Sequence, residues 1–256
     1  MKKMLVMILS IVMVFTAMTA FAEAASDKQY VLDKGKLVVG ITDFAPMDYK
    51  NEAGEWIGFD ADIAKAFAAK LGVEVEFVEI DWDNKILELN GQAVDCIWNG
   101  MTLTDAVKNA MECSNPYMNN AQVVVVPADK ADAYQTVESI ADLSFAAEAG
   151  SAGEAELNAL SLNVTPVATQ ADALMEVAAM TSDAAVIDAL MAAAMIGEGT
   201  SYENLTYTVG LNSEEYGVGF RKGSELTAML NAFMDKLIAD GTLPDLAQKY
   251  GLTLVE

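Results

Sequence analysis

The chain has 256 residues, of which 53% are hydrophobic, and it carries 38 acidic side chains against 15 basic ones, a formal net charge of −23 at pH 7. This acidity argues against binding to nucleic acid or to anionic membrane surfaces. Because the chain lacks histidine, it excludes His-based nucleophilic triads, and two cysteines alone make a poor zinc site. We therefore expect no metal and no other cofactor.

The chain begins with MKKMLVMILSIVMVFTAMTAFA, which combines two lysines, a long apolar run and a small-x-small ending. This pattern is typical of a secretory signal peptide, and we expect residues 1–22 to be removed after Ala22. Loss of Lys2 and Lys3 then changes the formal charge from −23 to −25. A transmembrane anchor is the alternative, since residues 4–22 nearly suffice to span a bilayer. Cleavage implies an exported protein, either periplasmic or extracellular.

The first half of the mature chain alternates apolar strand patterns with amphipathic helix patterns, which implies a doubly wound parallel α/β sheet. We expect strand 94–98 to break at Asn99-Gly100 into a polar turn, and the next helix to begin at Thr104. Small ligands bind at such strand ends in open α/β sheets. The other predicted elements are strands 36–41, 73–80 and 122–126 and helices 62–71 and 84–89.

A second set of alternating elements follows residue 126. The helix that begins at Ser151 carries an S-x-x-E capping box with Glu154. The other predicted helices are 137–143, 169–180, 189–196, 224–240 and 244–250, and the predicted strands are 144–147, 164–167, 184–187, 205–209 and 215–220.

Two strands at 122–126 and 216–220 have the pattern of crossings between two lobes. The first lobe would then be discontinuous, formed by residues 27–121 and 221–256, and the second would be formed by residues 122–220. The predicted fold is thus two doubly wound α/β lobes joined by a two-strand hinge. Such a hinge allows a ligand to be clamped between the lobes.

Six blocks of sequence, in one order along the mature chain, resemble the family-3 extracellular solute-binding proteins, the polar amino-acid receptors of ABC importers. The resemblance implies a Venus-flytrap fold and a monomer without catalytic activity. It also implies one small polar or amino-acid-like ligand and delivery of that ligand to an ABC permease in the membrane. The blocks are GFDADIAKAFAAKLG (58–72), ELNGQAVDCIWNGMTLT (88–104), SNPYMNNAQVVVV (114–126), AGSAGEAEL (149–157), SDAAVID (182–188) and EYGVGFRKGSEL (215–226).

The resemblance also implies a set of ligand-binding residues. Two rings, Phe44 and Trp82, would sandwich the ligand, while the carboxylate of Asp188 would hold an ammonium group. For Asp188 a helix N-cap is the alternative role. A neighbouring aromatic residue, Trp98, is as consistent with core packing as with a pocket wall. The full predicted site is Phe44, Trp82, Asn99, Gly100 and Thr102 in the first lobe and Ser151 and Asp188 in the second.

One position departs from the family pattern T-x-T-x-x-R, whose arginine holds the ligand's α-carboxylate. Here Val107 occupies that position, and the single arginine of the chain, Arg221, lies in the returning hinge segment. Lys108 is adjacent, but one residue along a helix turns the side chain by about 100°. We therefore favour a cationic or neutral polar ligand over an α-amino acid held in the usual way. The alternative is a carboxylate held by backbone N–H groups at 100–102 and at Ser151.

Two further questions stay open at this stage. The chain is also similar to cyclohexadienyl dehydratases, in which a cleft carboxylate acts as the acid, and Glu148 or Asp188 would have that role here. The missing arginine argues against this enzymatic alternative, because these enzymes bind carboxylated substrates. Cys96 and Cys113 are either a disulfide or two separate buried thiols.

Overall fold

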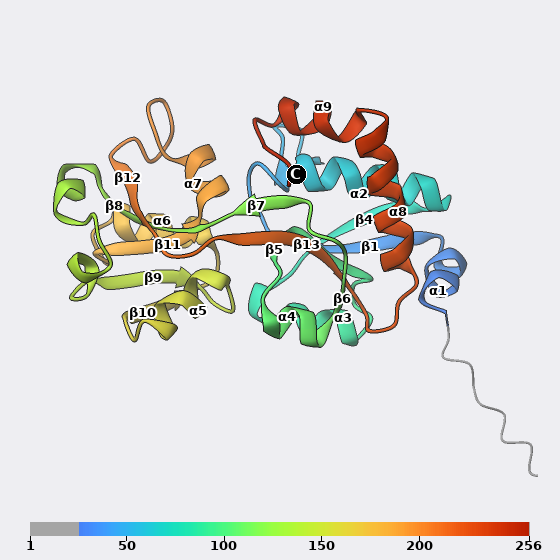
Figure 1. Cartoon of the computed structure of the whole chain (residues 1–256), viewed down its shortest axis with the longest axis horizontal. Helices are drawn as coiled ribbons and strands as arrows, with labels where there is room; N and C mark the ends of the chain where they lie inside the picture. The colour runs from blue at the N-terminus through green and yellow to red at the C-terminus, as the bar shows by residue number, and fades with distance from the viewer. Residues whose placement is uncertain (1–25, 256) are drawn as a thin grey trace, which may run out of the picture.

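The computed structural model describes residues 26–255, which form two α/β lobes side by side, each built on its own sheet (Figure 1). The strand order is β4-β1-β5-β13-β6 in the first sheet, with β7 also paired to β13, and β10-β9-β11-β8-β12 in the second. The predicted two-lobed α/β fold is thus confirmed. Within residues 26–255 no helix has the length and apolar character that crossing a membrane requires. The predicted signal peptide lies outside the described residues.

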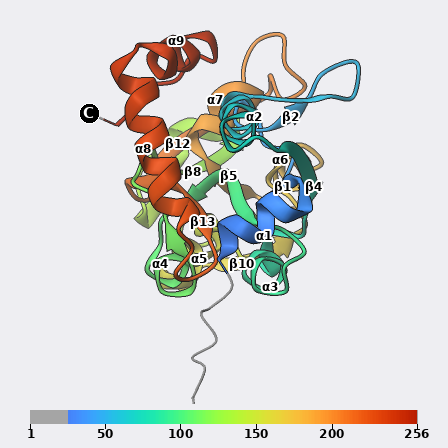
Figure 2. The same ribbon diagram turned by 90° about the vertical axis from the view of Figure 1, so that its right-hand side faces the viewer.

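The first sheet is covered by helices on both faces. In Figures 1 and 2, α2, α8 and α9 lie above it and α3 and α4 below it. β1 runs parallel to β4 and β5, whereas β13 is antiparallel to β5. The elements are α1 (Asp27–Lys34), β1 (Lys36–Ile41), β2 (Tyr49–Lys50), β3 (Trp56–Ile57), α2 (Phe59–Leu71), β4 (Glu74–Glu79), α3 (Lys85–Asn90), β5 (Cys96–Thr102), α4 (Asp105–Ala110), β6 (Glu112–Cys113), β7 (Met118–Asn120), β13 (Glu214–Phe220), α8 (Leu226–Ala239) and α9 (Thr242–Lys249).

The core of the first lobe forms two apolar layers, one on each face of this sheet. The layer beneath α2 and α8 contains Phe67 and Trp98, whose rings meet edge to face at 6.4 Å, and Trp98 is fully buried. Trp98 is therefore a core residue rather than a pocket wall. The opposite layer, beneath α3 and α4, includes Leu89, Val94 and Met111.

The second lobe has a smaller sheet between α5 on one side and α6 and α7 on the other, and apolar clusters fill both faces. Its strands β9, β10 and β11 are parallel, whereas β8 and β12 are antiparallel to their neighbours. The elements are β8 (Gln122–Pro127), β9 (Ser144–Glu148), α5 (Ala152–Ala159), β10 (Asn163–Val167), α6 (Gln170–Ala178), β11 (Ala184–Asp188), α7 (Ala189–Met195) and β12 (Leu205–Gly210).

The predicted helix 137–143 is wrong, because only a 3₁₀ turn, Glu138–Ile140, forms there. Ile140 is fully buried but Val137 is exposed, so the segment lacks an apolar face long enough to stabilise a helix. In addition, the hydroxyl of Ser139 donates to the backbone carbonyl of Thr136 at 2.7 Å. Such a bond competes with regular helical pairing.

The expected strand break at Asn99-Gly100 is also wrong. Strand β5 continues to Thr102, and the pairing with β13 changes register at this point, which is a β-bulge rather than an end. Gly100 permits the bulge because its φ is +55°, and a Cβ there would lie 2.6 Å from the Phe44 ring.

The two segments expected to be hinge strands each pair within one sheet. Gln122–Pro127 (β8) lies in the second sheet, whereas Glu214–Phe220 (β13) lies in the first, between β5 and β6. The chain therefore passes between the sheets around Ala121 and again between Gly210 and Glu214. The strand 216–220, which we assigned to the second lobe, is thus part of the first sheet. The division of the chain into two units that move as rigid bodies stays a prediction.

Candidate functional site

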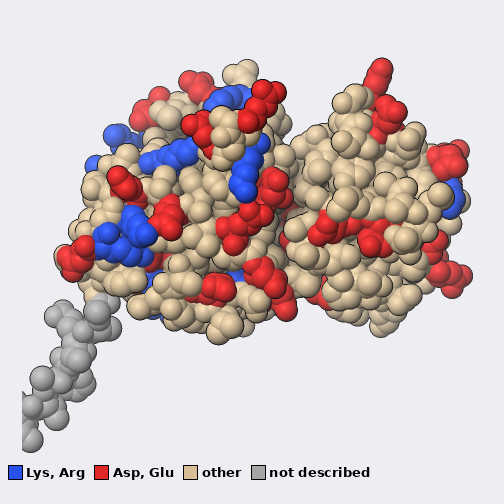
Figure 3. Space-filling view, turned by 180° about the vertical axis from the view of Figure 1, so that it is seen from behind, with Lys and Arg blue, Asp and Glu red and all other residues tan. Residues whose placement is uncertain are grey.

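A cavity of about 310 Å³ lies between the lobes and is lined from both of them. Its size falls within the usual range of small-molecule sites. Figure 3 shows the groove between the lobes from outside, with acidic side chains on both of its sides. All seven residues of the predicted site line the cavity: Phe44, Trp82, Asn99, Gly100, Thr102, Ser151 and Asp188. Phe44, Trp82, Ser151 and Asp188 lie at or just after the ends of strands, where α/β folds place ligands, whereas Asn99, Gly100 and Thr102 belong to β5 itself.

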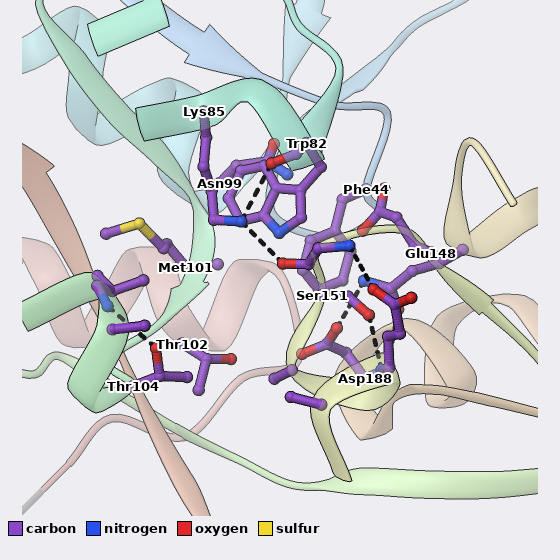
Figure 4. Close-up of a pocket in the computed structure, with 18 of the residues that line it drawn as sticks. Phe44, Trp82, Lys85, Asn99, Met101, Thr102, Thr104, Glu148, Ser151 and Asp188 are labelled. Carbon is purple, nitrogen blue, oxygen red and sulfur yellow. Dashed lines mark hydrogen bonds between the residues drawn. The ribbon is translucent and has the colours of Figure 1, made fainter. Parts of the chain in front are cut away.

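The two predicted aromatic residues follow the carboxyl ends of β1 and β4. Phe44 is 2% exposed and contacts the edge of Tyr216 with 6.3 Å between ring centroids. Trp82 is 8% exposed and opens a 3₁₀ turn whose N-cap is Asp81, which accepts from the Asp83 N–H at 3.2 Å. Both rings are thus held by the protein and contribute apolar walls to the cavity (Figure 4).

The polar groups of β5 are already bonded to the protein. Asn99 accepts from the Thr42 N–H at 2.9 Å and donates to the Thr42 hydroxyl at 2.7 Å, which ties β5 to the end of β1. The Gly100 N–H donates to Asp60 at 2.7 Å. The hydroxyl of Thr102 donates to Glu214 at 2.9 Å. Asn99 and Thr102 therefore shape the site, and the Gly100 N–H is not free for a ligand.

Ser151 caps helix α5, as predicted, and its hydroxyl accepts from the Glu154 N–H at 3.0 Å. The carboxylate of Glu154 reaches the Gly150 N–H at 2.7 Å, one residue before the position that a standard capping box uses. The Ser151 N–H donates to the Glu148 carbonyl at 3.1 Å. Two of the backbone donors proposed to hold a carboxylate unaided, at Gly100 and Ser151, are thus occupied.

Asp188 ends β11 and is 5% exposed. It stands at the N-cap position of α7, but its side chain makes no capping bond, so the N-cap alternative does not hold. Burial raises the pKa of Asp188 to about 7, and nearby Glu214 adds to the effect. The carboxylate accepts hydrogen bonds from side chains of both sheets and of helix α6: Asn120, Gln122, Gln170 and Tyr216.

Sequence reasoning missed Lys85 entirely, and it named Glu148 as an acid for the enzymatic alternative and as a loop charge that could add negative potential to the cleft. Lys85 is 7% exposed and lines the cavity, with its Nζ 4.9 Å from the centroid of the Trp82 ring. Glu148, at the end of β9, is 3% exposed, and burial raises its pKa to about 8. Lys85 follows Trp82 by three residues, a spacing that places two helical side chains on one face, and this signal could have found it.

The remaining candidates do not replace the missing arginine. Val107 lines the cavity with an apolar wall, whereas Lys108 does not line it and lies in an adjoining groove with Asn119 and Glu215. Arg221 binds Asp27 at 2.7 Å and Asp95 at 3.2 Å, within the first lobe, and is absent from the residues that line the cavity.

Both cysteines are free thiols. Cys96 pairs with Phe220 and Cys113 with Gly219, so β13 separates them. Two strands that flank a third lie about 9–10 Å apart, beyond the reach of a disulfide.

Comparison with known proteins places this geometry in a family. The sequence profile of the bacterial extracellular solute-binding proteins, family 3, matches residues 37–253. The arginine-binding extracellular protein ArtP of Bacillus subtilis is 28% identical over 257 residues, which covers 98% of each chain. The L-arginine-binding protein of Pseudomonas aeruginosa is 29% identical and covers 81% of this chain and 84% of its own.

Solved structures of amino-acid-binding proteins are also similar to this chain. A P235GK mutant of the arginine-binding protein from T. maritima superposes with a TM-score of 0.82 at 30% identity, covering 88% of this chain and 98% of the other. An ancestral amino-acid-binding protein described as a precursor of cyclohexadienyl dehydratase has a TM-score of 0.81 at 31% identity, covering 88% and 99%.

Proposed function

Because the chain belongs to family 3 of the bacterial extracellular solute-binding proteins, we propose that it captures a small amine-bearing, amino-acid-like solute between its lobes. The protein is a receptor of an ABC importer, and it delivers this solute to the membrane permease. Relatives named as binding proteins for arginine, for lysine, arginine and ornithine, and for histidine support a ligand that carries a basic group. We further propose that it acts as a monomer, outside the cytoplasm.

The observation that carries this proposal is the unfilled acceptor position on Asp188. Each of the two carboxylate oxygens offers about two lone-pair sites. Oδ1 accepts from Asn120, Gln122 and Tyr216, while among the described residues Oδ2 accepts from Gln170 alone. Because Asp188 also lines the cavity, a ligand ammonium can donate a hydrogen bond to Oδ2. This contact would offset the cost of burying the Asp188 charge.

The surrounding walls suit an amine with an organic side chain. Phe44 and Trp82 offer ring faces for an aliphatic or planar group, and Ile86, Met101 and Val107 add apolar surface. The deeper polar atoms are bonded to the protein, so the site is largely formed before a ligand arrives. We propose that the protein has no catalytic activity, and relatives that are named as binding proteins support this.

Titration calorimetry against amino acids, polyamines and heterocyclic amines tests the proposal. We expect Asp188→Asn to weaken binding of every amine-bearing ligand by at least about tenfold, since it removes a charge-assisted hydrogen bond. Asp142→Asn, at an exposed position of the same lobe, is the matched control and should leave affinity unchanged. An amine ligand that binds the Asp188→Asn variant as tightly as the wild type would contradict the proposal.

Turnover assays with prephenate-like acids separate the receptor from an enzyme. We expect no loss of substrate at protein concentrations that give full binding of the amine ligand. Catalytic consumption that disappears in Glu148→Gln would instead support the dehydratase alternative.

A further inference from the structure

Lys85 is the one buried lysine among residues 26–255, and it forms no salt bridge there. Buried ammonium groups are costly unless an anion compensates them. Its Nζ instead donates to two neutral acceptors, the carbonyl of Trp82 at 3.1 Å and the carbonyl of Gly150 at 2.8 Å. Among the described residues, no carboxylate oxygen therefore lies within 4.0 Å of this buried ammonium.

The ammonium of Lys85 lies between the two lobes, beside the cavity, rather than in the core of either lobe. Lys85 begins helix α3 in the first lobe, while Gly150 lies in the turn after β9 in the second, so the ammonium bridges the groove (Figure 4). An ammonium has three N–H donors, and the two carbonyls use two of them. The third is available to a group in the cavity that Lys85 lines.

The acidic side chains around Lys85 offset the burial of its charge only in part. The carboxyl groups that act on it are those of Glu148, Asp83, Asp81 and Glu154, and burial still lowers its pKa against their combined effect. Burial, followed by Asp188, raises the pKa of Glu148 to about 8, so this carboxyl is mostly protonated at neutral pH. Asp81 and Glu154 already accept backbone N–H groups, those of Asp83 and Gly150.

Other anchors for an anion in the cavity are weak. Lys85 is the only basic residue among the described residues that line it. The N–H groups of Gly100 and Ser151 are bonded to Asp60 and to the Glu148 carbonyl. Val107 presents an apolar side chain.

We propose that Lys85 binds a carboxylate of the ligand, and that the same ammonium, through Gly150, couples this contact to closure of the lobes. The inference rests on the proposed function and narrows it, because the ligand then carries both an amine for Asp188 and a carboxylate for Lys85. Amines without a carboxylate are excluded as physiological ligands. Lys85 is a specificity-determining residue that touches the ligand directly.

A set of three matched probes separates the two anchors. L-arginine has both groups, agmatine lacks the carboxylate, and 5-guanidinopentanoate lacks the α-amine; L-histidine, histamine and imidazolepropionate form a second set. We expect the wild type to bind at least one of the two amino acids at least tenfold more tightly than its decarboxylated amine. Lys85→Met should weaken the carboxylate-bearing probes by at least tenfold and leave the amines unchanged.

Two further variants complete the design. Lys85→Gln keeps a hydrogen-bond donor but carries no charge, and it should also lose the preference for carboxylate-bearing probes. Agreement between the two variants would show that the effect does not come from a folding defect of Lys85→Met. Lys70→Met, at an exposed position on α2, is the matched control and should behave as the wild type. Circular dichroism melts of each variant verify that it is folded before binding is measured.

Several results overturn the inference. If Lys85→Met lowers the affinity for carboxylate-bearing probes and for amines equally, Lys85 only holds the two lobes together and does not bind the carboxylate. Binding of amines but not of carboxylate-bearing probes to the wild type also overturns it, while leaving the amine site at Asp188 standing. Absence of binding by every carboxylate-bearing probe counts against it as well. Conversely, if Asp188→Asn leaves all affinities unchanged while Lys85→Met acts on the acids alone, the proposed amine site fails and the carboxylate site stands.

Discussion

The hydroxyl of Tyr216 donates a hydrogen bond to the carboxylate of Asp188 and thereby joins a strand of the first sheet to a strand end of the second. Glu214, two residues earlier on β13, accepts from Gln122 at 2.8 Å and from Asn120 at 2.6 Å, and both amides also donate to Asp188. The place where the chain crosses between lobes is therefore the place where the proposed amine anchor is held. A ligand amine bound to Asp188 as proposed would act directly on the groups that connect the lobes.

Replacement of Tyr216 by Phe should weaken an amine ligand by about tenfold at pH 7, since a hydrogen bond to a charged group contributes about 1.5–3 kcal/mol. The Tyr216 bond favours the ionised form of Asp188, so its loss should also move the pH dependence of binding to higher pH. Calorimetry of wild type and variant from pH 6 to pH 9 measures both effects. Equal affinities at every pH would show that the hydroxyl does not support the anchor.

Stability of the ligand-free protein should fall as pH rises from 5 to 8. The pKa values of Glu148, about 8, and Asp188, about 7, lie above those of the unfolded chain, so the folded state retains protons that the unfolded state has lost. The contribution of these two groups to stability is therefore fully present below the unfolded pKa values near 4, and it is lost as the pH rises through the folded pKa values. Glu148→Gln should melt several degrees higher than the wild type at pH 8 and at nearly the same temperature at pH 5. A wild-type melting temperature that rises over this range would contradict the assignment.

Gly150→Ala should hold the lobes apart. The residue has a φ of +70°, and an added Cβ would lie 2.8 Å from the Asp83 Cα of the opposite lobe. Gly54→Ala is the matched control, since Gly54 has a φ of +79° with no atom within 4 Å of its added Cβ. Both variants carry the same backbone strain, of about 1 kcal/mol. Only Gly150→Ala should reduce ligand affinity by tenfold or more and enlarge the ligand-bound protein in small-angle scattering; equal effects in the two variants would argue against a closure contact.

The thiols of Cys96 and Cys113 should remain reduced in the native protein. Titration of the denatured, non-reduced protein should yield two thiols per chain, because β13 keeps the cysteines apart. Added reductant should leave the melting temperature unchanged. A fall of several degrees on reduction would instead reveal a disulfide and a different arrangement of β5, β13 and β6.

Local pattern predicted much of this fold. Strand 36–41 was predicted with its observed bounds, because it is a short apolar run between a helix end and a polar loop. The seven predicted site residues all line the cavity, and the family resemblance points to each of them, although Asn99 and Gly100 lie within β5 rather than at its end. Their roles as ligand contacts stay predictions.

What the pattern did not reveal depends on partners distant in the chain. The sequence around Gly100 has the pattern of a strand end. The structure shows that Asp60, forty residues earlier, accepts the Gly100 N–H within a continuous strand. Lys85 looks like the solvated face of a short helix until the Gly150 carbonyl, 65 residues later, covers it. Asp188 likewise gains its donors from β7, β8, α6 and β13, and no local window contains them all.

The position of β13 has a consequence for biosynthesis. The strands of the second sheet lie within one continuous stretch, from Gln122 to Gly210, so this lobe can form as soon as that stretch is available. The first sheet instead cannot be completed until β13 is available, because β13 lies between β5 and β6. When a chain crosses a membrane with its amino end first, the second lobe can therefore fold before β13 has emerged. At that stage β5 still has an unpaired edge. Until residue 220 emerges, that exposed edge is the part of the molecule most in need of a chaperone.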